Sequence, residues 1–268
     1  MLVRTLIVSL ILTLITSVSC SLAVPNLRCV TDGLVSFWTF DESDIEGDTA
    51  KDVWSGKGAT LKDDARIKSG GKIDEGLQLG EVGFAEVAND PVFDFGTGDY
   101  TIEAWVKIAI VERNPIVFMG SWGGPAYAYE LTLRKGDPYK GCFARMYAAQ
   151  PMYQVLSPGA DKTGYLSDSS WHHIVFVRSS TSYMYIDGEV VGSTNALVDL
   201  DASSDQNLFI GKDPDPNYFN GMIDELRIYS KALSENEVQH NFMLESNELS
   251  VNPVDRMITI WGEIKALH

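Results

Sequence analysis

Strict alternation over one nine-residue run is the feature that most constrains how this chain can fold. Within residues 100–108, apolar residues recur at every second position, and the residues between them are Thr101, Glu103, Trp105 and Lys107. A period of two places neighbouring side chains on opposite faces of a β-strand, whereas a helix has a period of 3.6. The run therefore predicts a strand with one face turned to a core.

Similar short runs continue along the chain, separated by Gly, Asp, Asn and Pro. The further predicted strands are 34–41, 76–79, 128–133, 171–178, 183–186, 208–210 and 222–229. Many short strands without intervening helices are typical of a sandwich or a jelly roll. We predict an all-β fold, a two-sheet antiparallel β-sandwich with one short C-terminal helix.

Two local signals add detail to this architecture. Asp187-Gly188 stands between two strand-like runs, and its tolerance of positive φ predicts a tight hairpin turn. Ser234 and Glu237 have the spacing of a capping box, in which each side chain accepts a hydrogen bond from the other residue's backbone amide. We expect a helix over 235–244.

The charge balance excludes one class of partner. The chain has 37 acidic and 21 basic residues, and its formal net charge is -16. Binding to the phosphate backbone of DNA or RNA needs clustered Lys and Arg, so no nucleic acid partner is expected. Acidic side chains supply instead the oxygen ligands that calcium prefers.

The N-terminal segment has the pattern of an export signal. Arg4 precedes an apolar stretch over 6–18 that is too short to span a bilayer, and Ser21 and Ala23 fit a small-residue cleavage site. We predict a signal peptide over 1–23 and a secreted, extracellular or cell-surface protein without a transmembrane segment. An alternative interpretation makes Cys20 the lipid anchor of a lipoprotein.

Four ordered stretches resemble the LamG-like jelly roll of the concanavalin A-like lectin/glucanase superfamily. They are 33–42 (GLVSFWTFDE), 101–106 (TIEAWV), 170–175 (SWHHIV) with the later 185–188 (YIDG), and 219–229 (FNGMIDELRIY) with 231–234 (KALS). The resemblance implies a domain over 24–245, followed by a tail over 246–268. It also implies a two-sheet sandwich that binds carbohydrate or protein ligands, often with calcium, although the superfamily contains glycoside hydrolases as well.

Asp41 and Asp224 are the candidate metal ligands. Asp41 closes the first predicted strand and Asp224 lies in the last, and terminal strands of jelly rolls usually neighbour each other. Calcium takes six to eight oxygens, so backbone carbonyls and water would complete its shell. The alternative is two unconnected acids at the surface or in turns.

Cys29 and Cys142 are the two cysteines that remain after cleavage at Ala23. In an oxidising compartment they can pair, and closing a loop of about 112 residues would contribute up to about 4 to 5 kcal/mol. We predict this disulfide, although sequence alone does not bring the two Cα atoms within bridging range.

The region 122–165 is rich in aromatic residues, and it is our candidate ligand wall. Trp122, Tyr127 and Tyr153 offer rings for the C–H faces of sugars, and Arg145 can donate hydrogen bonds to sugar hydroxyls. The alternative is ordinary core packing, because aromatic residues also dominate sandwich cores.

A retaining glycosidase needs two carboxylates about 5 Å apart, in a Glu-x-Asp-x-x-Glu pattern in this superfamily. Around Asp224 the two Glu positions hold Met222 and Arg227, and we expect Glu225 to face the opposite side. The prediction is thus no enzyme but an exported non-catalytic binding module that recognises a glycan or an extracellular protein ligand, with a structural calcium ion. The alternatives are a purely structural adhesion module and a glycoside hydrolase.

Overall fold

The computed structural model describes most of the region between residues 29 and 244. The described residues are 29–108, 113–121, 128–134, 141–147, 153–156, 166, 168–195, 200–215 and 217–244. In strands β10 to β12, the side chains of 128, 134, 141–143, 145–147 and 153–156 are excluded from the description. The predicted signal peptide over 1–23 and the tail over 246–268 lie outside the described residues.

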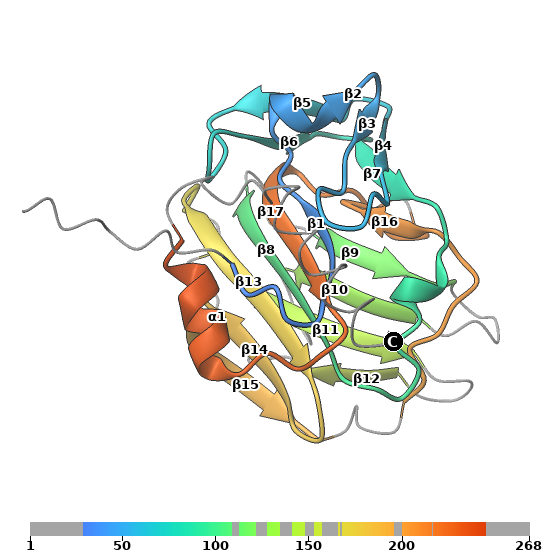
Figure 1. The fold of residues 1–268 in the computed structure, drawn as a ribbon, viewed down its shortest axis with the longest axis vertical. Coiled ribbons are helices and arrows are strands. Elements are labelled where there is room, and N and C mark those ends of the chain that lie inside the picture. The colour runs from blue at the N-terminus through green and yellow to red at the C-terminus, as the bar shows by residue number, and fades with distance from the viewer. Residues whose placement is uncertain are drawn as a thin grey trace, which may run out of the picture.

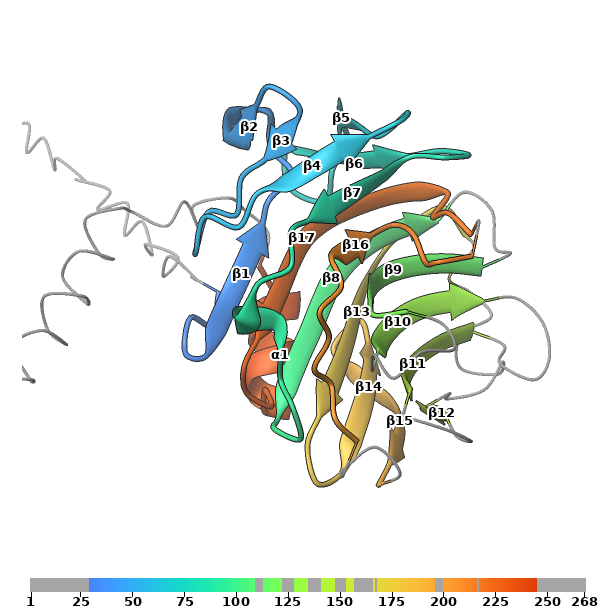
Figure 2. The same cartoon turned by 90° about the vertical axis from the view of Figure 1, so that its right-hand side faces the viewer.

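The described chain is almost entirely β-structure, as Figures 1 and 2 show. In chain order the elements are β1 Leu34–Trp38, η1 Glu42–Asp44, β2 Ile45–Glu46, β3 Thr49–Ala50, β4 Ala59–Lys62, β5 Arg66–Ser69, β6 Glu75–Leu79, β7 Phe84–Val87, η2 Pro91–Phe93, β8 Tyr100–Ile108, β9 Arg113–Met119, β10 Ala128–Arg134, β11 Gly141–Tyr147, β12 Tyr153–Leu156, β13 Trp171–Arg178, β14 Ser182–Ile186, β15 Glu189–Thr194, β16 Leu208–Ile210, β17 Gly221–Tyr229 and α1 Glu235–Phe242.

The strands form two antiparallel sheets. One has eight described strands in the order β15-β14-β13-β8-β17-β6-β5, with β1 also paired to β17. The other has nine described strands in the order β12-β11-β10-β9-β16-β7-β4-β3-β2. The first and last strands of the domain are therefore neighbours, with Trp38 opposite Leu226. The predicted sandwich is confirmed.

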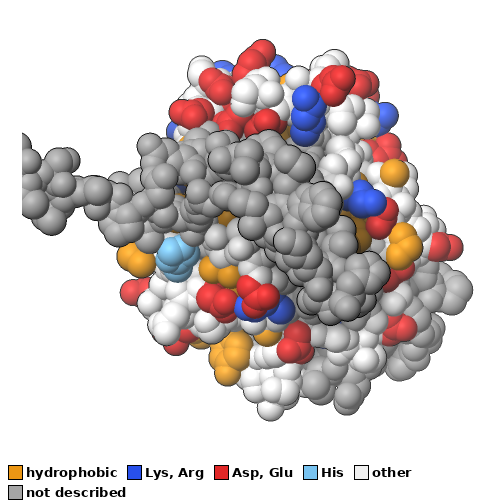
Figure 3. Space-filling view, in the orientation of Figure 1, with side chains coloured by type: hydrophobic (Ala, Val, Ile, Leu, Met, Phe, Trp, Pro, Cys, Tyr) orange, Lys and Arg blue, Asp and Glu red, His pale blue; other side chains and the backbone are white. Residues whose placement is uncertain are grey.

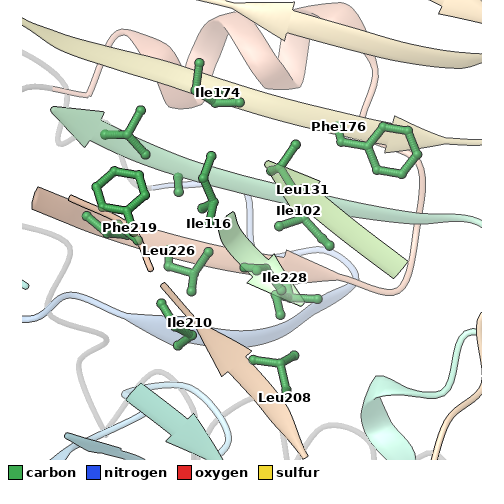
Figure 4. Close-up of a cluster of buried hydrophobic side chains, with 14 of the residues drawn as sticks. Ile102, Ile116, Leu131, Ile174, Phe176, Leu208, Ile210, Phe219, Leu226 and Ile228 are labelled. Carbon is green, nitrogen blue, oxygen red and sulfur yellow. The ribbon is translucent and has the colours of Figure 1, made fainter. Parts of the chain in front are cut away.

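The main core fills the space between the two sheets. Ile102 and Ile228 of the eight-stranded sheet face Leu131 and Ile210 of the other sheet, as Figure 4 shows. All four side chains are buried. The alternation in β8 explains this arrangement, because its even-numbered residues join the core while Glu103 and Trp105 point to the other side. We call that other side, turned away from the partner sheet, the outer face.

Helix α1 closes the outer face of the eight-stranded sheet, and the segment before β1 lies beside it. Val238 of α1 joins a second apolar cluster with Val175, Tyr229 and Cys29. Phe242 of α1 also stacks on Trp105, with ring centroids 5.6 Å apart. The capping box of Ser234 and Glu237 begins this helix as predicted. In the described part of the chain, no helix has the length and apolarity to cross a bilayer.

A buried ionic cluster lies between α1 and the sheet. Glu103 of β8 contacts Arg227 Nη1 at 3.2 Å and Tyr229 Oη at 3.3 Å. Asn241 of α1 donates to Glu103 Oε1 at 2.9 Å and to Tyr229 Oη at 3.0 Å, while its Oδ1 accepts from the backbone amide of Val30 at 2.9 Å. One side chain thus connects the helix, two strands and the N-terminal segment.

Cys29 carries a free, buried thiol at the edge of this cluster. Burial raises the pKa of the thiol, and the nearby Arg227 guanidinium opposes that rise. Cys142 belongs to β11 of the nine-stranded sheet, and its side chain is outside the description. Because only the thiol of Cys29 is described, its predicted pairing with Cys142 stays a prediction.

The Asn241 contacts predict a measurable stability loss. We expect Asn241→Ala to lower the free energy of unfolding by about 2 to 3 kcal/mol, because it removes one hydrogen bond from the buried Glu103 carboxylate and one from Tyr229, and leaves the partly buried Val30 amide without its acceptor. Urea unfolding measures the change. Asn236→Ala is the matched control, since Asn236 is exposed on the same helix and should change stability by less than about 0.5 kcal/mol. Equal losses for the two variants would contradict the role of Asn241.

Candidate functional site

Asp41 and Asp224 both contact the loop between β5 and β6. Asp224 Oδ2 accepts from the backbone amides of Lys72 and Ile73 at 2.7 and 3.1 Å, and Asp41 Oδ1 accepts from the amide of Glu75 at 3.4 Å. We call these two carboxylates and residues 71–75 the acidic loop site. The structure therefore brings the two predicted metal ligands to one loop, although they are 183 positions apart.

The loop fits tightly against Asp224. A Cβ atom at Gly71 would lie 1.8 Å from the Glu75 carbonyl oxygen and 2.8 Å from Asp224 Oδ2, so only glycine is accommodated there. Asp224 is fully buried, and burial together with the negative charge of Glu225 holds its pKa well above the usual range. Burial also raises the pKa of Asp41 to about 6. Burial thus favours the protonated, uncharged form of both carboxyl groups, and their ionised form needs a positive partner in a region with little water.

A β-bulge corrects one prediction at this site. Glu225 has a φ of +51°, and the register between β17 and β8 shifts between Asp224 and Arg227. The expectation that Glu225 faces away from Asp224 is wrong, since Glu225 pairs with Arg227 on the same outer face. Asp41 and Glu103 also raise the pKa of Glu225, although burial is the main cause and brings it to about 7. Alternation fails because the bulge inserts one extra residue.

The acidic loop site supplies only part of the ligand shell that a metal ion needs. Within the described ranges, no three His, Cys, Asp or Glu side chains gather in a metal-binding arrangement. The oxygens of two carboxylates match the shell of calcium better than the nitrogen and sulfur shell of zinc, although backbone amides of residues 72, 73 and 75 already donate to them. The chemistry of these donors fits calcium.

The outer face of the nine-stranded sheet carries a second polar and aromatic group of residues. Arg113 of β9 contacts Glu130 Oε1 at 3.1 Å and Asp213 Oδ2 at 2.8 Å, and both contacts are made by Nη2. Asn217 donates to both oxygens of Asp213 at 3.0 and 3.1 Å. The guanidinium therefore bridges two buried carboxylates and balances part of their charge.

Three aromatic rings lie on the same face. Phe84 of β7 packs edge-on against Phe209 of β16 with centroids 6.0 Å apart, and Tyr218 lies 6.4 Å from Phe84. The Lys212 ammonium sits 4.1 Å from the Phe84 centroid. Phe209, Tyr218 and Lys212 are partly exposed. We call these four residues the outer patch. Sequence reasoning missed it, because Phe84, Phe209 and Tyr218 are distant in the chain and only strand pairing assembles them.

The predicted ligand wall is only partly within the described chain. Trp122 and Tyr127 lie outside the described residues. Arg145 and Tyr153 are placed in β11 and β12, but their side chains are excluded from the description. In the backbone register Arg145 pairs with Glu130 of β10. Arg145 therefore lies on the strand next to Glu130, and the role of the predicted wall in binding stays a prediction.

Asp213 makes the stability of the fold depend on pH. Burial raises its pKa to about 6 from an ordinary value of 3.8, an effect that Asn217 and Arg113 oppose and that Glu130 adds to. The folded state thus holds the proton more tightly than the unfolded state. We expect the wild type to lose about 2 to 3 kcal/mol relative to Asp213→Asn as pH rises from about 4 to about 6.

Urea unfolding of both proteins across this pH range gives the measurement. Other titrating groups, such as His172, contribute equally to both proteins and cancel in the difference. A difference that is flat from pH 4 to 6 would contradict the raised pKa of Asp213.

Comparison with solved structures identifies similar folds. Domain 4 of AbnA, a GH43 extracellular arabinanase from Geobacillus stearothermophilus, in complex with arabinotriose, aligns with a TM-score of 0.59 and 19% identity, over 79% of this chain and 98% of that domain. The binding domain of Paraclostridial Mosquitocidal Protein 1 aligns with a TM-score of 0.60 and 19% identity. There the alignment covers 78% of this chain but only 52% of that domain.

A third similar structure is the binding domain of botulinum neurotoxin DC in complex with rat synaptotagmin II, with a TM-score of 0.57 and 13% identity. That alignment covers 80% of this chain and 52% of the toxin domain. At these identities the likeness shows the fold alone. No curated protein matches the chain in sequence. Residues 80–239, more than half of the chain, match the Laminin_G_3 family, and the protein therefore belongs to the concanavalin A-like lectin/glucanases superfamily.

Proposed function

We propose that this chain is an exported, non-catalytic module that binds carbohydrate at the outer patch. The observation that carries the proposal is the partial exposure of the Phe209 and Tyr218 rings on a sheet face, beside the charged groups of Arg113 and Asp213. Sugars present C–H faces that stack on such rings, and polar groups nearby fix their hydroxyls. Backbone pairing on both sides of β16 holds Phe209 in place.

The comparisons support this class of ligand. The arabinanase domain, 98% of which aligns with this chain, is known in complex with arabinotriose. Export is consistent with the extracellular arabinanase to which that domain belongs. Because the toxin domain is in complex with synaptotagmin II, a protein surface is the alternative ligand. The partly exposed rings of Phe209 and Tyr218 favour the sugar, because the C–H faces of sugars stack on aromatic rings.

A non-catalytic role agrees with the state of the carboxylates. Glu225 pairs with Arg227, Asp224 accepts backbone amides, and Glu130 shares Arg113 with Asp213. Each of these acids is buried and engaged within the protein. A retaining glycosidase needs one protonated and one ionised carboxyl group that both reach the substrate. We therefore assign binding rather than hydrolysis to this domain.

The carbohydrate proposal predicts the effect of removing one ring. We expect Tyr218→Ala to weaken binding of polysaccharides such as arabinan by about 1 to 3 kcal/mol, by analogy with base stacking on aromatic platforms. Affinity gel electrophoresis and calorimetry measure it. Tyr183→Ala is the control, since Tyr183 is a partly exposed ring on β14 of the other sheet. The proposal fails if the parent protein binds no saccharide in a panel of plant and bacterial glycans.

We also propose that calcium binds at the acidic loop site. Asp41 and Asp224 would hold the ion together with carbonyls of loop 71–75, and the ion would neutralise their charge and fix the loop to the last strand. The support is the convergence of two buried carboxylates, Asp41 after β1 and Asp224 in β17, on one close loop. The ion then stabilises the native state, to which alone it binds.

The calcium proposal predicts a shift in melting temperature. Calcium at about 100 times its Kd should add about 2.7 kcal/mol of stability, which EDTA should reverse. We expect Asp224→Asn to abolish the calcium response, whereas Asp48→Asn, at an exposed position near β3, should preserve it. Differential scanning calorimetry with and without EDTA measures both. Identical melting curves for the parent protein in calcium and in EDTA would refute the site.

A further inference from the structure

Lys212 presents a cation on the outer patch. Its ammonium lies 4.1 Å from the Phe84 centroid, 5.5 Å from that of Phe209 and 5.7 Å from that of Tyr218. Within the described part of the chain, no carboxylate lies in ion-pairing distance of Lys212 Nζ. The ring faces attract the cation and remove part of its hydration. The charge is therefore held at a fixed point, with no described counter-charge.

Several other basic groups in this acidic protein are paired with carboxylates, whereas Lys72, like Lys212, lies over an aromatic ring, 4.2 Å from the Trp105 centroid. Arg113 and Arg227 each contact two carboxylates. Lys57 pairs with Asp90, and Lys231 pairs with two acids. With 37 acidic residues in the chain, an aspartate or glutamate is a common neighbour for a lysine. The outer patch instead surrounds its lysine with aromatic rings.

Described contacts anchor the residues on either side of Lys212. Gly211 has a φ of +81°, and a Cβ atom there would lie 2.2 Å from Leu79 Cδ1, so the chain turns where only glycine fits. The Phe219 amide donates to the Gly211 carbonyl at 2.8 Å, and Asp213 is anchored by Arg113 and Asn217. The cation and the rings are thus positioned before any ligand arrives, which lowers the entropy cost of binding.

We propose that the outer patch selects saccharides that carry a carboxylate, with the sugar ring on Phe209 or Tyr218 and the carboxylate on the Lys212 ammonium. This inference rests on the proposed carbohydrate function and names its ligand class. A charge-assisted hydrogen bond is about twice as strong as a neutral one, so the anion gains more from Lys212 than a hydroxyl does. The net charge of -16 repels anions at long range, so selection depends on this short-range contact.

Trigalacturonate and its methyl ester form the matched pair of probes, because they share the same rings and differ in charge. We expect isothermal titration calorimetry to show the parent protein binding the acid about tenfold more tightly than the ester. Lys212→Met should remove this preference while keeping an apolar stem over the rings. Lys212→Arg should keep the preference, since it keeps the charge. Lys68→Met is the control, at an exposed lysine on β5 of the other sheet.

The outcomes separate the two proposals. If the acid and the ester bind the parent protein equally, or if Lys212→Met keeps the preference, the selection by Lys212 is overturned while the carbohydrate function stands. If neither probe binds but neutral arabinan does, the ligand class is again wrong and the function stands. If no saccharide binds at all, the proposed function itself fails. The comparison of the two probes on the parent protein needs no variant to fold.

Discussion

Burial of the Glu103 and Arg227 charges is the constraint on which the arrangement around the eight-stranded sheet depends. Two ions removed from water are costly unless every polar group around them finds a partner. Glu103 has Arg227, Tyr229 and Asn241 as partners, and these belong to β17 and α1. Helix α1 must therefore sit at one place on the sheet. Its position in turn covers the outer face there, as Figure 1 shows.

The β-bulge in β17 combines a strained backbone with the orientation of the Asp224 carboxylate. A glutamate at positive φ costs about 1 kcal/mol or more, and such strain persists only where surrounding contacts fix it. Glu225 is fixed by Arg227, and its amide donates to Asp224 Oδ1 at 2.9 Å. The bulge thereby orients the Asp224 carboxylate toward loop 71–75. Asp224, Glu225 and Arg227 thus link the acidic loop site to the ionic cluster under α1.

The sequence predicted eight of the described strands, the sandwich, the capped helix and the neighbouring positions of the first and last strands. Local periodicity is a property of a short segment, and the pairing of terminal strands involves only one neighbouring strand. Both can therefore be inferred from the sequence. The face of Glu225 was predicted wrongly, because a β-bulge breaks the alternation of side chains between the two faces. No glycine at positions 224–227 indicates this bulge in the sequence. The outer patch was not predicted, since Phe84 and Phe209 meet only through the pairing of β7 with β16.

The two outer faces divide stability from recognition. On the eight-stranded sheet, the charges of Glu103 and Arg227 are paired internally and lie under α1. On the nine-stranded sheet, Phe209, Tyr218 and Lys212 keep partial exposure. Acidic side chains are spread over the face of the molecule seen in Figure 3, with lysines and arginines among them. The net negative charge of the protein does not attract anions at long range. On such a surface, short-range contacts with aromatic rings and with a single lysine are what can discriminate between ligands.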